Sequence, residues 1–342
     1  MVHSPVVSVI ILNWNGRRYL ATCLDSLRRQ TYGDFEIIVV DNGSVDDSAE
    51  FIETHYSNLV RLMVLPRNRG FAGGNNVGLG EAKGRLIALL NNDTEAHPDW
   101  LAHLVRCVED GPRTGMVGSK VLNFYRRDEI DNTGHLMYPD GMNRGRGRLE
   151  RDTGQYDGQR EILFPSGCAA LYSRKMLEEI GGFDESFFAY GDDADIGLHG
   201  RFLGYRAVFC PEAVVYHRYS GTAGSYSAMK AFFVERNRVW VLIKYFPFSS
   251  IVVSPFYTLA RFVLHAYGIF TGRGAAGRFA GNASVGQLVR TILWAYGSAI
   301  RGLPDMLRRR KKIFKQRKVG IHELRRMLGQ HRISCREISL KD

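Results

Sequence analysis

The chain has 342 residues, of which 45% are hydrophobic, so it is long enough for one large domain with an appendage and a well-buried core. Its five cysteines are odd in number, widely separated and never spaced as CxxC, which argues against a disulfide scaffold and predicts reduced thiols in the cytosol. The formal net charge is +11, and residues 301–342 hold fourteen Lys/Arg against four Asp/Glu, a net charge of +10. Such a basic tail suits an anionic membrane or a nucleic acid.

The N-terminal part alternates between apolar, β-branched runs and helical patterns. Residues 6–12, 35–40 and 61–65 predict strands, and residues 19–29 and 48–56 predict helices that pack on a sheet. This order predicts an α/β fold with a doubly wound, mostly parallel sheet. The first residues lack the basic region and cleavage site of a signal peptide, so we expect this part of the chain to stay on the cytoplasmic side of the membrane.

The alternation continues further along the chain. Residues 85–90 predict a buried strand that stops in Asn91-Asn92-Asp93-Thr94. Residues 125–158 are rich in Arg, Gly and Asp without a clear period, and predict long loops, partly over an active site. Further strands are expected at 115–122, 164–172, 205–209 and 213–216, and further helices at 98–108, at 174–180 and from Ile196.

Asp93 directly follows a predicted strand. Ligands sit beyond the carboxyl ends of the strands in an open parallel sheet, so Asp93 could reach a hard cation or a ligand hydroxyl. Taken alone, Asn-Asp-Thr after a strand is more often a turn or a helix cap. His217 follows the last predicted strand, and with Asp93 it would complete a mixed nitrogen and oxygen site for Mn²⁺ or Mg²⁺. A lone histidine is, however, more often structural.

Residues 67–78 contain four glycines. These glycines would let the backbone approach a ligand closely, and a helix that starts near Ala72 would direct its free N–H groups toward a phosphate. The alternative is a flexible loop that leads into a glycine-rich helix. Neither this segment nor the first turn between strand and helix contains GxGxxG, which disfavours a dehydrogenase.

Three carboxylates, Asp192, Asp193 and Asp195, lie close together after an aromatic segment. Carboxylates in apolar surroundings with neighbours of like charge tend to have raised pKa values, which prepares one of them to act as a general base. The alternative is a group of acids at a helix N-terminus. One Asp is enough to cap a helix, so three Asp residues in four positions favour a role for this cluster in acid-base chemistry.

In this order, the motifs resemble those of the family 2 glycosyltransferases, the inverting enzymes with the GT-A fold. Within the family they look most like the bacterial dTDP-rhamnosyltransferase-type enzymes, which elongate O-antigen and related surface polysaccharides. The resemblance implies a Rossmann-like GT-A catalytic domain at residues 1–225 and a helical region at 226–342. The matching segments are 8–15, 41–44, 68–78, 91–94, 181–184, 192–196 and 217–221.

The resemblance also implies how a nucleotide-sugar donor and a metal ion would be bound. Trp14 and Asp41 would cradle the nucleotide base, and Asn92 would contact the donor as part of a DxD-type element. Asp93 would bind Mn²⁺ or Mg²⁺, and His217 would complete the metal shell. The residues expected to border the nucleoside diphosphate are Asn68, Gly70 and Asn75.

For the acids, the resemblance implies that Asp193 is the catalytic base and that Asp192 holds the acceptor. Two positions depart from the family pattern. Asn91-Asn92 replaces a more acidic Asp-Asp, so the metal would be held more weakly or largely by the diphosphate. Gly191-Asp192-Asp193 stands where Glu-Asp is common, which leaves the division of labour between the two acids open.

The C-terminal region suggests peripheral attachment to the cytoplasmic membrane. Residues 240–270 are the most apolar part of the chain, but their longest uncharged run, 245–260, is shorter than the roughly 20 residues of a spanning helix. We therefore expect broken helices that pack on the domain or lie in a bilayer interface. An apolar helical stripe at Leu288, Ile292, Tyr296 and Ile300 precedes a polybasic run at 308–318, which suits an anionic membrane surface. A solvated helix face is the alternative.

The family resemblance agrees with membrane attachment, because such enzymes often act on polyprenyl-linked glycan acceptors. The donor sugar follows only by analogy: L-rhamnose is the first choice, and a UDP-sugar is the alternative. A basic-tailed nucleic-acid-binding protein is a less favoured alternative, since aromatics are sparse in the tail and no nucleic-acid motif occurs. A homo-oligomer is compatible with the sequence.

Overall fold

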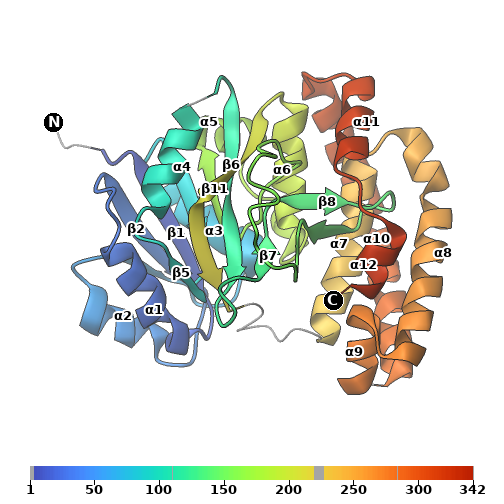
Figure 1. The fold of residues 1–342 in the computed structure, drawn as a ribbon, viewed down its shortest axis with the longest axis horizontal. Helices are drawn as coiled ribbons and strands as arrows, with labels where there is room; N and C mark the ends of the chain where they lie inside the picture. The colour runs from blue at the N-terminus through green and yellow to red at the C-terminus, as the bar shows by residue number, and fades with distance from the viewer. Residues whose placement is uncertain (1–3, 110, 219–226, 283, 342) are drawn as a thin grey trace. The chain divides into compact units, whose positions relative to one another are not determined.

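The computed structural model describes residues 4–109, 111–218, 227–282 and 284–341 (Figure 1). The chain divides into two compact units. The sheet unit lies within Met1–Gly134, Gly145–Arg201 and Tyr205–Thr222, and the helical unit lies within His135–Arg144, Phe202–Gly204 and Ala223–Asp342. The short segment 135–144 thus belongs to the helical unit, although the residues before and after it in the sequence belong to the sheet unit.

A nine-stranded sheet forms the centre of the sheet unit, with strand order β3-β2-β1-β4-β10-β6-β11-β5 and with β7 paired to β6. Strands β3, β2, β1 and β4 are parallel, as are β6 and β11, whereas β10 runs antiparallel to both β4 and β6. The predicted α/β fold is therefore confirmed. Its sheet contains both parallel and antiparallel strand pairs. The strands are β1 (Val7–Asn13), β2 (Phe35–Asp41), β3 (Arg61–Val64), β4 (Leu86–Leu90), β5 (Thr94–Ala96), β6 (Thr114–Asn123), β7 (Ile130–Asn132), β10 (Ala169–Ser173) and β11 (Arg206–His217).

Helices pack on both faces of this sheet. Buried side chains of α1, α2 and α4 join alternate strand residues in one continuous apolar core. On the opposite face, Gly74 and Gly78 of α3 bring that helix close to the side chains of Leu12 and Ile10. The two faces follow from the two-residue period of a strand. The helices are α1 (Arg17–Arg28), α2 (Ser48–Tyr56), α3 (Gly70–Glu81), α4 (Trp100–Glu109), α5 (Arg174–Ile180) and α6 (Asp192–Phe202).

The strands bring polar residues to one edge of the sheet. Asn13 at the end of β1 pairs with Asp41 at the end of β2, and His217 at the end of β11 pairs with Thr94 of β5. Because β10 runs in the opposite direction, it begins at this edge, where Ala169 pairs with Leu90 of β4. Segments far apart in the sequence therefore meet at the carboxyl ends of the parallel strands.

The segment 125–158, expected to form loops, contains three short strands. These are β7 and the paired strands β8 (His135–Met137) and β9 (Asn143–Gly145), and three residues are too few to leave a period in the sequence. The strand expected at 164–172 begins only at Ala169. Pro165 lacks a backbone N–H group and cannot donate to a sheet ladder, so the first part of the apolar run stays outside the strand.

The two strands expected at 205–209 and 213–216 are a single strand, β11, with a register shift between Cys210 and Val214. Pro211 lies in this irregularity, where the strand needs no backbone donor. The helix expected from Ile196 begins earlier, at Asp192, so the acidic cluster lies in its first turn. Acidic residues there interact favourably with the helix dipole.

The helical unit contains most of the C-terminal third. Its apolar segment is broken, as predicted, where α7 ends at Tyr245 and α8 begins at Phe248, but Pro255 lies within α8 without ending it. Within the described ranges, no helix combines the length and the apolar character needed to cross a bilayer. The helices are α7 (Ala228–Tyr245), α8 (Phe248–Thr271), α9 (Gly274–Asn282), α10 (Val285–Gln316), α11 (Ile321–Gln330) and α12 (Cys335–Leu340).

Candidate active site

Asp93 and His217 lie in contact at the carboxyl edge of the sheet. Nε2 of His217 is 3.3 Å from Oδ1 of Asp93, and both side chains are buried. The other ring nitrogen, Nδ1, is 2.6 Å from Oδ2 of Asp131, and Oδ1 of Asp131 is 3.1 Å from a guanidinium nitrogen of Arg148. Asp131 therefore orients the imidazole so that Nε2 is directed toward Asp93.

The Asp93 and His217 pair fits a divalent cation. Two ligand atoms that each lie about 2.1 Å from an ion, at right angles, are about 3.0 Å apart, and the observed separation is 3.3 Å. A carboxylate oxygen with an imidazole nitrogen suits Mn²⁺, and a metal-binding histidine usually gives its second N–H to a carboxylate, as His217 does to Asp131. The structure thus brings together the two expected metal ligands.

Burial by itself lowers the pKa of His217, but Cys168 and the carboxylates of Asp93 and Asp131 raise this pKa well above its ordinary value. Burial also raises the pKa of the Cys168 thiol, although His217 opposes this effect. The carboxylates of Asp93 and Asp131 thus outweigh burial in setting the pKa of His217. A bound cation would replace the proton on Nε2 and leave the Nδ1 hydrogen bond to Asp131 in place.

Amide side chains connect the ends of β1, β2 and β4. Nδ2 of Asn13 donates to Oδ2 of Asp41 at 2.9 Å, and Nδ2 of Asn92 donates to Oδ1 of Asn13 at 2.7 Å. Gly16 makes room for this network, because a Cβ atom there would lie 2.0 Å from Nδ2 of Asn92. Asp41 and Asn92 are buried and held at a fixed spacing, and Trp14 lies half-buried in the loop that follows β1.

The loop between β3 and α3 is fixed by side-chain amides. Oδ1 of Asn68 accepts hydrogen bonds from Gly70 N at 2.7 Å and from Nδ2 of Asn42 at 3.0 Å. Gly70 has φ +75°, and a Cβ atom there would lie 2.3 Å from the carbonyl oxygen of Phe188. Only glycine combines this backbone conformation with so close an approach.

The N-terminus of α3 differs from the expected phosphate cradle. The N–H groups of Phe71 and Ala72 donate to the carbonyl oxygen of Phe188, at 2.5 and 3.4 Å, so they are already occupied by protein. Asn75 is buried, and its amide donates to the carbonyl of Phe71 at 2.9 Å rather than toward the sheet edge. A diphosphate at this helix end would have to replace the Phe188 carbonyl.

The segment before α6 has a strained backbone. Phe188, Tyr190 and Gly191 have φ values of 63°, 65° and 79°. Bulky residues rarely adopt this left-handed conformation, and such strain is typical of functional sites. The carbonyl of Phe188 in this turn contacts the start of α3, and Glu185, shortly before the turn, forms an exposed ion pair with Arg69 at 3.0 Å.

Asp192 and Asp193 differ in their surroundings at the start of α6. Asp192 is buried, and burial together with the nearby Asp193 raises its pKa well above the ordinary value. Asp193 is half-buried, and its Oδ1 accepts a hydrogen bond of 2.8 Å from the N–H of Ala194. The interpretation of the cluster as helix-terminal acids is thus partly correct, since Asp193 also stabilises the helix end.

Asp93 and Asp193 approach the same dipeptide, residues 167–168. A Cβ atom on Gly167 would lie 3.8 Å from Cβ of Asp193. The next residue, Cys168, hydrogen-bonds His217 and interacts electrostatically with Asp93. Asp93 and Asp193 therefore both approach residues 167–168, which directly precede β10, although they are far apart in the sequence.

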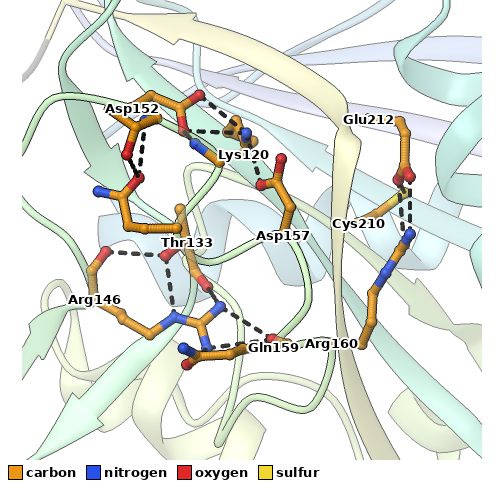
Figure 2. Close-up of polar contacts among 12 residues, drawn as sticks. Lys120, Thr133, Arg146, Asp152, Asp157, Gln159, Arg160, Cys210 and Glu212 are labelled. Carbon is orange, nitrogen blue, oxygen red and sulfur yellow. Dashed lines mark hydrogen bonds and ion pairs between the residues drawn. The ribbon is translucent and has the colours of Figure 1, made fainter.

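Buried cations brace the segment that carries Asp131 (Figure 2). A guanidinium nitrogen of Arg146 donates to the carbonyl of Thr133 at 2.8 Å, and Nζ of Lys120 on β6 is 2.9 Å from Asp152. Both cations are almost fully buried, so these contacts are protected from water. Lys120 thus attaches the irregular segment to β6, and Arg146 joins two parts of this segment close to Asp131 in the sequence.

Sequence reasoning did not identify Asp131, Arg148 or Asn42. Asn42 lies within the matched segment 41–44, and its position directly after a strand end could have drawn attention to it. Asp131 lies in an irregular segment 86 residues before its partner His217, so no local pattern marked it. Residues 219–221, which belong to the last matched segment, lie outside the described residues.

Several known proteins are similar to this chain in sequence or in fold. The family model described as glycosyl transferase family 2 matches residues 8–181. An uncharacterized glycosyltransferase of Rickettsia prowazekii is 27% identical over 195 residues, which are 57% of this chain and 58% of that protein. The O-antigen biosynthesis protein RfbC of Myxococcus xanthus is 27% identical over 228 residues, which are 64% of this chain and only 18% of that protein. The chain therefore spans less than two thirds of these relatives.

Solved structures show the same fold at low identity. GalNAc-T7, crystallised with UDP, GalNAc and Mn²⁺, superposes with a TM-score of 0.60 at 18% identity, over 77% of this chain and 51% of that chain. The mannosyltransferase PcManGT of Pyrobaculum calidifontis, in complex with GDP-Man and Mn²⁺, has a TM-score of 0.53 at 19% identity, over 92% and 86% of the two chains.

Proposed function

Because this chain belongs to glycosyl transferase family 2, we propose that it transfers a sugar from a nucleoside-diphosphate donor to a hydroxyl group of an acceptor, with inversion at the sugar carbon. The main support is the meeting of two different groups of side chains at one sheet edge. Asp93 with His217 suits a cation-bound diphosphate, and Asp192 with Asp193 suits an attacking alcohol.

In the proposed reaction, Asp193 takes the proton from the acceptor hydroxyl as that oxygen attacks C1 of the donor sugar. The bond between C1 and the diphosphate oxygen breaks in the same step, so the configuration at C1 inverts. Asp193 suits the role of base because it is partly exposed, whereas the buried Asp192 suits orienting the acceptor or Asp193 itself. Mn²⁺ or Mg²⁺ held by Asp93 and His217 would supply positive charge to the leaving diphosphate.

The nucleotide would bind beside the amide network. In this proposal, Trp14 and Asp41 contact the base, and Asn92 holds the loop after β1 at a fixed distance from Asp93. Asn68 and Gly70 shape the loop next to the diphosphate. Asn75 would act indirectly, because its amide is bonded within α3.

For the donor, we propose L-rhamnose carried by dTDP, with a UDP-sugar as the alternative. The solved neighbours were crystallised with UDP or GDP-Man, so the fold accommodates more than one nucleotide. For the acceptor, we propose a glycan, carried on a polyprenyl lipid, in the synthesis of a surface polysaccharide. The name of the RfbC relative, an O-antigen biosynthesis protein, supports this choice. A lipid-linked acceptor would also require attachment to the cytoplasmic membrane surface.

Incubation of the purified protein with a panel of nucleotide sugars tests this proposal. Released nucleoside diphosphate should appear with one donor, in a reaction that depends on Mn²⁺ or Mg²⁺, and NMR of the product should show an inverted anomeric centre. Asp93→Ala should abolish the release. Failure of every donor to release its nucleoside diphosphate, with cation and glycan acceptors present, would contradict the proposal.

A further inference from the structure

Helix α8 exposes an apolar stripe along its whole length. Its 24 residues span about 36 Å at 1.5 Å per residue. Seven large apolar side chains repeat every three or four residues on the exposed side, with exposed fractions that reach 75% at Phe256 and 88% at Phe270. This outer stripe consists of Phe248, Val252, Phe256, Leu259, Val263, Tyr267 and Phe270.

The polarity of α8 is the reverse of that of an ordinary surface helix. Its buried positions are Ser254, Arg261 and Gly268, and no exposed residue of this helix is charged. The only other titratable side chain with basic character is His265, whose pKa is lowered to about 4 by burial and by the neighbouring Arg261, so it is neutral near pH 7. A helix that meets water normally places its charged residues outside.

The polar interior of α8 is held by ion pairs. Arg261 is fully buried and contacts Oδ2 of Asp140 at 2.8 Å and the two carboxylate oxygens of Glu235 at 2.6 and 3.0 Å. Glu235 also pairs with Arg238 at 2.9 Å. Two carboxylates thus balance two guanidinium groups inside the helical unit. Since these contacts fix which side of α8 faces inward, the outer stripe cannot be buried by a simple rotation of the helix.

Basic side chains border the outer stripe. A guanidinium nitrogen of Arg325 donates to the hydroxyl of Ser249 at 2.9 Å, near the start of α8, and the guanidinium of Arg332 lies 5.6 Å from the ring of Tyr257. Arg273 and Arg278 are exposed just beyond the end of the helix. An apolar strip with a positive border complements a bilayer surface that contains anionic lipids.

From this arrangement we propose that the outer stripe of α8 docks on an anionic lipid bilayer, with the helix in the plane of the membrane. The inference rests on the proposed function only in that a lipid-linked acceptor would give the docking a purpose. A second copy of the chain is a less suitable partner, because two identical positive borders would repel each other. The proposal adds α8 to the predicted membrane contact on α10. Of the stripe predicted there, Ile300 is exposed and Leu288, Ile292 and Tyr296 are half-buried, while Leu293 and Trp294 of the same helix are also exposed.

Flotation of the full-length chain with lipid vesicles tests the docking. The wild type should float with vesicles of phosphatidylcholine and phosphatidylglycerol, and much less with phosphatidylcholine alone. Phe256→Glu and Phe270→Glu should each lower the bound fraction by about 10-fold or more, since each places a charge in the apolar contact. Val64→Glu is the matched control, because Val64 is a large, exposed apolar residue on β3 of the sheet unit.

Three results would overturn the proposal: a wild type that does not float with anionic vesicles, α8 variants that float as well as Val64→Glu, or a wild-type dimer that Phe256→Glu dissociates without any vesicle binding. Circular dichroism and thermal melting check that each variant is folded. Release of nucleoside diphosphate is measured separately, without lipid. An inactive wild type that floats would contradict the proposed function alone, and an active wild type that does not float would contradict the docking alone.

Discussion

Replacement of Asp131 by asparagine tests whether this carboxylate orients His217 for a cation. The hydrogen bond between them is 2.6 Å long, and Asp131 and His217 are 12% and 9% exposed. A hydrogen bond to a charged group contributes about 1.5–3 kcal/mol and a neutral one about 0.5–1.5 kcal/mol, so the substitution should cost about 1–2 kcal/mol. The affinity for Mn²⁺ should therefore fall by about 10-fold, at the lower end of the about 10–100-fold typical of partners that orient metal ligands.

The assay is a Mn²⁺ titration of the protein with nucleoside diphosphate, in which electron paramagnetic resonance reports the free ion and no turnover is needed. Asp128→Asn is the matched control, since Asp128 is an exposed carboxylate on the same segment, paired with Arg151 at 3.1 Å. Thermal melting identifies any loss of folding. If Asp131→Asn binds Mn²⁺ as tightly as the wild type while Asp93→Ala does not, the orientation argument is refuted.

Asp193→Asn should leave donor binding intact and lower turnover by about 100-fold or more; normal release of nucleoside diphosphate would reject Asp193 as the base. Gly70→Ala should lower both thermal stability and donor affinity, because its Cβ would lie 2.3 Å from a backbone carbonyl at φ +75°, whereas Gly33→Ala, with nothing within 4 Å, should change neither. Arg261→Met should reduce the free energy of unfolding of the helical unit by about 3–5 kcal/mol in denaturant titrations, since it leaves Arg238 as the remaining guanidinium beside the two buried carboxylates Asp140 and Glu235. Burial raises the pKa of Glu235, but its ion pair with Arg261 outweighs burial and holds the pKa well below the ordinary value. The loss of unfolding free energy in Arg261→Met should therefore be complete at neutral pH and disappear as the pH falls through the pKa of Glu235 in the folded protein. A loss of the same size in acid would contradict the ion pair as its cause.

Local signals in the sequence were sufficient for the strands and for the polar residues that follow them. The apolar runs that become β1, β2 and β4 are buried on both faces, so they stand out as continuous hydrophobic stretches. Each ends abruptly in polar residues such as Asn13, Asp41 or Asn92. Since parallel strands share the direction of their carboxyl ends, the meeting of these residues at one edge follows from the predicted topology.

Contacts between distant segments were not predictable from local patterns. The bond from His217 to Asp131 joins a long strand to a three-residue strand within an irregular segment. The occupation of the α3 N-terminus by the Phe188 carbonyl likewise depends on a turn with positive φ more than a hundred residues later in the chain. In both cases a tertiary contact determines the hydrogen-bonding partner, and sequence periodicity carries no information about it.

The sequence did not predict which side of α8 is exposed, for a different reason. Its sequence shows an apolar run with one arginine, and a hydrophobic pattern alone suggests that the arginine faces water. In the structure, Asp140 and Glu235 hold Arg261 inside, and the apolar side chains face outward. The partners of Arg261 come from residues 135–144 and from α7, so only the assembled helical unit reveals which side is exposed.

The carbonyl of Phe188 has a kinetic consequence. It caps α3 beside the proposed diphosphate position and belongs to the strained turn that leads to Asp192 and Asp193. A donor that took over the N–H groups of Phe71 and Ala72 would release that turn, and the acidic pair would reach its working position only afterwards. Catalysis would then follow a compulsory order, with the nucleotide sugar entering before the acceptor, and product-inhibition patterns would show nucleoside diphosphate competing with the donor alone.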